Sequence, residues 1–62
     1  MSQQISDRIK NMIQKKASEG DSKLQEVEEW IGKLKNAGFN VNDLETRLVQ
    51  AQLKNQRLRE LL

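Results

Sequence analysis

A chain of 62 residues without cysteine or histidine cannot form disulfides, and it lacks the thiolate and imidazole ligands of ordinary zinc, copper and haem sites. Because 32% of the residues are charged, none is proline and only three are glycine, the composition favours helices over strands in one small domain, residues 1–62. The formal net charge of +2 is too small to indicate a polyanionic partner.

The chain shows no feature of a membrane or secreted protein. No segment approaches the run of about 18 apolar residues that a transmembrane helix needs. The N-terminus also lacks the basic start and apolar stretch of a signal peptide. We therefore expect a cytoplasmic protein with no membrane partner.

Two helices are expected in the first part of the chain, at about residues 3–18 and 22–37. The first has apolar residues at helical spacing, including Ile9, Met12 and Ile13. Residues 18–21 interrupt this pattern, and Gly20 is placed to end the helix. The second helix then has an apolar stripe with alternating spacings of three and four residues: Leu24, Val27, Ile31 and Leu34.

The segment from Leu34 to Leu44 predicts a tight connection between two helices. Gly38 is expected to take a positive φ after the last helical residue, which places Leu34 and Phe39 as the apolar pair of a Schellman ending. Asn40 is then a good N-cap for the next helix, with Asp43 at N3 and with Phe39 and Leu44 as a hydrophobic staple. The expected hinge comprises six residues: Leu34, Gly38, Phe39, Asn40, Asp43 and Leu44.

A third helix is expected at about residues 41–61, and it is predicted to be the longest of the three. Its apolar seam keeps the spacing of a coiled coil over three heptads, and Asn55 occupies the first position of a heptad, position a. Val49 and Leu53 point away from this seam, so the helix is apolar on two sides, and such surfaces usually mark contacts. The expected protein interface comprises Leu48, Val49, Leu53, Asn55, Leu58, Leu61 and Leu62.

Asn55 has two interpretations at this point. In a parallel coiled coil, a buried Asn at an a position pairs with its counterpart and fixes the register and the number of strands. On an exposed helix end it has no such role. The first interpretation requires that the chain associate through the third helix.

Catalysis is not expected, because the sequence has no histidine, cysteine or tyrosine and no Gly-rich phosphate loop. A small-molecule substrate and a cofactor are not expected either. A stronger alternative is nucleic-acid binding, because basic side chains occur in the first and third helices. Those candidates are Arg8, Lys15, Lys16, Lys54, Arg57 and Arg59.

These patterns predict an all-α protein, either a three-helix up-down-up bundle or helical hairpins that pair between chains, with a coiled-coil-like C-terminal helix. The expected function is a small non-enzymatic interaction or oligomerisation module, which binds itself as a homodimer or another helical protein. Two alternatives stay open: a small regulatory nucleic-acid binder, and an inhibitor whose hairpin sequesters one protein partner.

Overall fold

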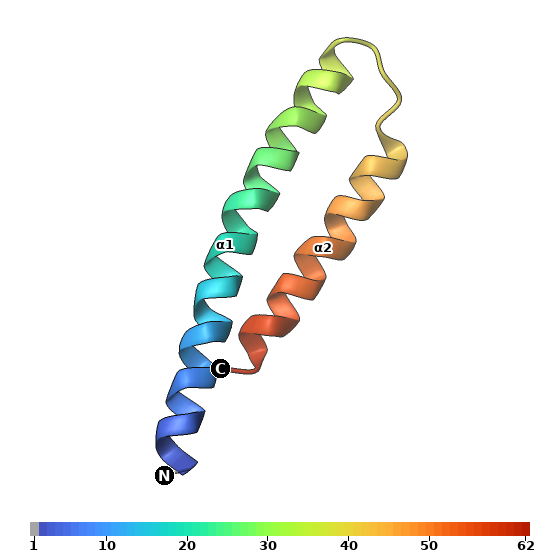
Figure 1. Ribbon diagram of the computed structural model, residues 1–62. Coiled ribbons are helices and arrows are strands. Elements are labelled where there is room, and N and C mark those ends of the chain that lie inside the picture. The colour runs from blue at the N-terminus through green and yellow to red at the C-terminus, as the bar shows by residue number, and fades with distance from the viewer. Residues whose placement is uncertain (1) are drawn as a thin grey trace.

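The chain folds as a helical hairpin in the computed structural model, which describes residues 2–62 and the side chains from Ser6 onward. These residues form two helices and no strand: α1, Ser2–Asn36, and α2, Asn42–Glu60. The helices run antiparallel in an elongated rod with extents of 56 × 15 × 10 Å (Figure 1). The all-helical class is confirmed, whereas the three-helix arrangement is not found.

The predicted helices at residues 3–18 and 22–37 are one continuous helix, so the expected break at Gly20 is wrong. A glycine inside a helix costs up to about 1 kcal/mol relative to alanine. The structure shows what is gained here: a Cβ built on Gly20 would lie 2.6 Å from Oδ1 of Asn55 in α2. Gly20 therefore allows α2 to approach, and it does not terminate α1.

The relative lengths of the helices also differ from the prediction. α1 has 35 residues and α2 has 19, which correspond to lengths of about 52 and 28 Å. The longest helix is therefore α1, and its N-terminal part extends past the end of α2 (Figure 1). We call residues 2–16 the overhang, since they precede Ala17, the first α1 residue with a hydrogen bond to α2; Ile13, near the end of this segment, is still half-buried.

The connection between the helices has the Schellman geometry that its sequence predicts. Gly38 has a φ of 92°. The Phe39 N–H donates to the Leu34 carbonyl at 3.0 Å and the Gly38 N–H donates to the Lys35 carbonyl at 3.1 Å. These two bonds satisfy carbonyl groups at the end of α1 that would otherwise have no partner.

The start of α2 differs from the predicted cap. The N-cap residue is Val41, which has no side-chain cap bond, and not Asn40. The Asn40 side chain instead accepts a hydrogen bond from the Asn42 N–H at 3.0 Å, as in an Asx turn. Asp43 lies in the first turn and pairs with Arg47 at 3.3 Å. Because the N-cap moves to Val41, Phe39 and Leu44 are not at the staple positions.

Very little of the hairpin is buried. Among the described side chains only Ala17, Ile31 and Val41 have less than 9% of their surface exposed. A longer set is half-buried along the seam between the helices: Ile13, Gly20, Leu24, Leu34, Leu48, Asn55 and Leu58. The apolar stripes predicted for residues 22–37 and 41–61 thus pack against each other within one chain.

Candidate interaction surface

Asn55 of α2 makes hydrogen bonds to two residues of α1. Its Nδ2 donates to the Ala17 carbonyl at 3.1 Å and to Oδ1 of Asp21 at 2.6 Å. Ala17 is fully buried and Gly20 lacks a side chain, so small residues on α1 leave room for the amide. A polar side chain with such fixed partners sets the antiparallel alignment of the helices within the chain.

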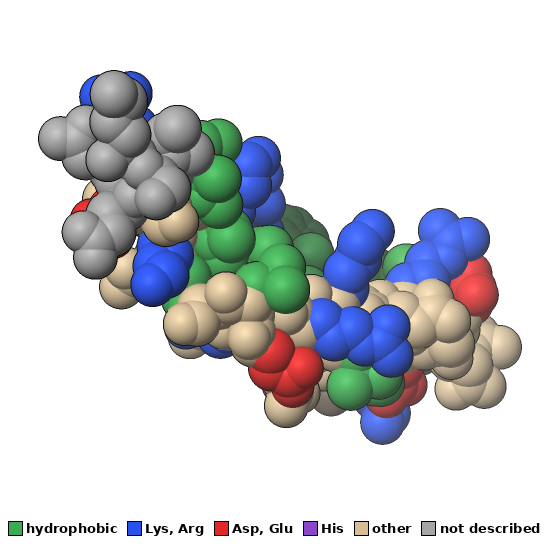
Figure 2. Space-filling model, turned by 90° about the horizontal axis from the view of Figure 1, so that it is seen from below, with side chains coloured by type: hydrophobic (Ala, Val, Ile, Leu, Met, Phe, Trp, Pro, Cys, Tyr) green, Lys and Arg blue, Asp and Glu red, His purple; other side chains and the backbone are tan. Residues whose placement is uncertain are grey.

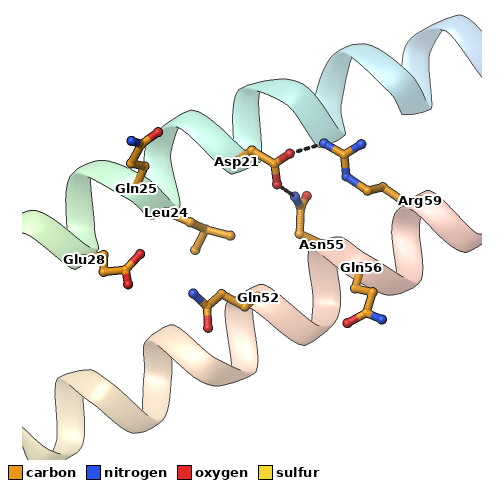
Figure 3. A pocket seen from close by; sticks show the side chains of 8 residues that line it. All are labelled: Asp21, Leu24, Gln25, Glu28, Gln52, Asn55, Gln56 and Arg59. Carbon is orange, nitrogen blue, oxygen red and sulfur yellow. Dashed lines mark hydrogen bonds and ion pairs between the residues drawn. The ribbon is translucent and has the colours of Figure 1, made fainter.

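Asp21 also contacts a second α2 residue, Arg59. The Arg59 guanidinium donates a hydrogen bond to Oδ2 of Asp21, and the two side chains form an ion pair (Figure 3). Both side chains are about half exposed, so solvent weakens the pair. These residues lie at one end of a shallow polar groove of about 380 Å³ between the helices. It is lined by Asp21, Leu24, Gln25, Glu28, Gln52, Asn55, Gln56 and Arg59.

The other side of the seam has a different character. There the helices form a shallow groove of about 410 Å³ with apolar walls from Gly20, Leu24, Ala51 and Leu58. Lys23 on α1 and Lys54 on α2 line its edges. This side can accept apolar side chains from another helix, whereas the polar side offers amide and carboxylate groups.

Large apolar side chains are exposed along the whole hairpin. Ten of those described have between 39% and 68% of their surface in water. They are Ile9, Met12, Val27, Trp30, Phe39, Leu44, Val49, Leu53, Leu61 and Leu62. Seen from its open end, the molecule shows apolar surface with Lys and Arg side chains nearby (Figure 2). So many exposed large apolar side chains on a small chain favour a contact surface.

The structure divides the residues predicted for the interface into two groups. Leu48, Asn55 and Leu58 are half-buried on the seam with α1. The other four, Val49, Leu53, Leu61 and Leu62, are exposed. Val49 and Leu53 are one helical turn apart, on the side of α2 away from α1.

The six basic candidates of the nucleic-acid alternative are all exposed. Since the helices are antiparallel, Arg8, Lys15 and Lys16 of α1 lie toward the same open end of the hairpin as Lys54, Arg57 and Arg59 of α2 (Figure 1). Of these, Arg59 is paired with Asp21. The antiparallel arrangement thus places basic residues from both ends of the sequence toward the same end of the rod.

Sequence reasoning missed the α1 partners of Asn55. Ala17, Gly20 and Leu24 continue the alternating spacing of the α1 stripe through the supposed break. That continuity indicated that α1 is one helix, with Gly20 on the side that faces another helix. The exposure of Met12 and Trp30 was also missed.

Other kinds of site find no support in the described residues. No group of three or more acidic, His or Cys side chains is placed there to hold a metal ion. Neither described helix combines the length and apolar character needed to cross a membrane. Comparisons with protein families, curated proteins and solved structures found no match for this chain.

Proposed function

We propose that this protein is a small non-enzymatic interaction module that functions by helix–helix association, first of all with a second copy of itself. The observation that carries the proposal is the imbalance between buried and exposed apolar surface. Three described residues are buried, while ten large apolar side chains stay 39–68% exposed. Chains of this size rarely gain more than about 3–5 kcal/mol from one core, so further burial in a partner would stabilise the fold.

The total surface supports the same proposal. A compact protein of 7.2 kDa is expected to expose about 4,100 Å², whereas this hairpin exposes 5569 Å². The excess is about 1,400 Å², more than the roughly 800 Å² that each partner contributes to a standard stable interface. The hairpin therefore has enough surplus surface for a complete interface.

Both helices offer exposed apolar surface for this contact. The sequence assigned it mainly to the C-terminal helix, but exposed apolar side chains occur on α1 as well, at Ile9, Met12, Val27 and Trp30. On α2 the exposed candidates are Val49, Leu53, Leu61 and Leu62. Leu58 is half-buried on the seam, so a charge there would disturb the hairpin as well as any contact.

Sedimentation equilibrium across a wide concentration range tests this proposal. We expect the mass to rise to twice 7.2 kDa, and the melting temperature to increase with concentration because association stabilises only the folded chain. A folded monomer with a melting temperature independent of concentration would contradict self-association.

Nucleic-acid binding is a second candidate, supported by the six basic side chains that the hairpin collects toward its open end. A protein that contacts several phosphates loses affinity steeply as salt rises. Fluorescence anisotropy with a labelled duplex should then give binding that weakens by orders of magnitude between low and physiological salt. Reversing Lys15 and Lys16 to Glu should abolish it, and retained binding would exclude these side chains as contacts.

A further inference from the structure

The exposed apolar side chains of α1 lie on one face of the helix. Ile9 and Met12 are three residues apart, as are Val27 and Trp30, and all four are 44–62% exposed. At about 100° per residue, Ile9 and Val27 have the same direction around the axis, and so do Met12 and Trp30. One pair lies on the overhang and the other near the hinge.

The two pairs are related by symmetry about one point. Ile9 and Trp30 are equally distant from the midpoint between residues 19 and 20, and so are Met12 and Val27. When two copies of a helix lie antiparallel and centred there, Ile9 comes level with Trp30 of the second copy, and Met12 with Val27. Apolar side chains would then meet apolar ones at both ends, as a two-fold interface requires.

The middle of the same face is polar and has the same symmetry. Lys16 and Lys23 are also equally distant from the midpoint, and all of these residues share one side of α1. In the centred alignment Glu19 of one copy comes between these two lysines of the other. Charged groups placed between two apolar ends favour one alignment over shifted ones.

The charge along the rod favours the antiparallel orientation. The overhang, residues 2–16, has four basic residues and one acidic residue, for a net charge of +3. The hinge end of α1, residues 23–37, which the centred antiparallel alignment places beside the overhang, has three basic and three acidic residues, for a net charge of 0. A parallel pair would place two overhangs of charge +3 side by side, whereas the antiparallel pair places each overhang beside a segment of no net charge.

We call this side of α1 the flanking face; it consists of Ile9, Met12, Lys16, Glu19, Lys23, Val27 and Trp30. We propose that the flanking face is self-complementary and that two copies of the chain pair through it in antiparallel orientation. The overhang of each copy then lies beside the hinge end of the other. The occupant is thus a second copy of this chain. The inference rests on the proposed function, because it assigns the partner and the orientation of that association.

Substitution distinguishes the flanking face from the exposed surface of α2. Met12→Glu places a charge on the flanking face, and Leu53→Glu places the same charge on α2, where the side chain is 49% exposed. We expect Met12→Glu to weaken the dimer at least tenfold by sedimentation equilibrium and Leu53→Glu to change it less than threefold. Circular dichroism should show that both variants remain helical. The reverse order of effects would overturn the proposal in favour of a contact through α2.

Orientation is tested with spin labels, which the absence of native cysteine makes straightforward. Asn36→Cys and Ser22→Cys each introduce one labelling site at an exposed position. In the centred antiparallel pair the two Asn36 sites lie about 50 Å apart along the axis, whereas the Ser22 sites lie close together. In a parallel pair both distances are short, set by an axis separation of about 10 Å and the label linkers.

The outcomes separate the inference from the function on which it rests. A long distance at Asn36 with a short one at Ser22 supports the antiparallel seam. Short distances at both sites overturn it while leaving self-association intact. A monomer throughout the concentration range overturns both.

Discussion

Gly20→Ala tests whether α2 really approaches α1 at this point. Alanine in a helix interior is favoured over glycine by about 1 kcal/mol, so in open space the substitution should stabilise the chain by that amount. The added Cβ would, however, lie 2.6 Å from Oδ1 of Asn55, and that side chain must move. Its displacement breaks its bonds to Ala17 and Asp21, which contribute about 0.5–1.5 kcal/mol each.

The net effect follows from these two opposing terms. Two lost bonds cost about 1–3 kcal/mol against the gain of about 1 kcal/mol. Gly20→Ala should therefore lie between no change and a loss of about 2 kcal/mol. In a chain that already carries Asn55→Ala the clash is absent, and the same substitution should stabilise by about 1 kcal/mol. The expected coupling between the two positions is thus about 1–3 kcal/mol.

Gly32→Ala is the matched control, since nothing lies within 4 Å of a Cβ built there. It should raise the free energy of unfolding by about 1 kcal/mol. Urea unfolding followed by far-UV circular dichroism, at one fixed protein concentration, measures all four variants. Equal stabilisation by Gly20→Ala and Gly32→Ala, with no coupling to Asn55, would refute the close approach.

Three further substitutions should give graded effects in the same unfolding assay. Gly38→Ala should destabilise by about 1–2 kcal/mol, because its φ of 92° is a left-handed conformation that alanine disfavours; an unchanged midpoint would contradict the Schellman ending. Asp21→Ala should cost about 1 kcal/mol by removing the acceptor of Asn55 and Arg59, and a cost that persists undiminished in high salt would argue against the ion pair. Arg47→Ala should cost less than about 0.5 kcal/mol, because its pair with Asp43 is exposed; a larger loss would mean that Arg47 has another contact.

The contrast between Gly20 and Gly38 shows how much of the fold was accessible from sequence. Both glycines follow an apolar stripe and precede residues typical of helix caps. The Schellman ending also has an apolar pair at C″ and C3. Phe39 and Leu34 provide that pair at Gly38, whereas the equivalent residues at Gly20 are Asp21 and Lys16. The Schellman ending at Gly38 was therefore predictable, although the start of α2 was not, and the same criterion, applied to Gly20, would have argued against a break there.

The partner of Gly20 could not be obtained in the same way. Its absence of a side chain matters only because Asn55, 35 positions later, occupies the space. Local sequence carries no signal for a contact over that separation, and the interruption of the apolar pattern at residues 18–21 gave the opposite indication. The length of the overhang was missed for the same reason, since one wrong break halves α1 and makes the C-terminal helix appear the longest.

The placement of Asn55 also limits how the protein can associate. One of the two interpretations of Asn55 paired this amide with its counterpart in a second chain, but both of its bonds are made within the hairpin, to Ala17 and Asp21. An association through the seam of α2 would have to break them and separate α2 from α1. The apolar surface outside the seam is already exposed and requires no such step. Association that leaves the hairpin intact must therefore use these outer surfaces, and on α1 they form a face with the symmetry of a two-fold pair.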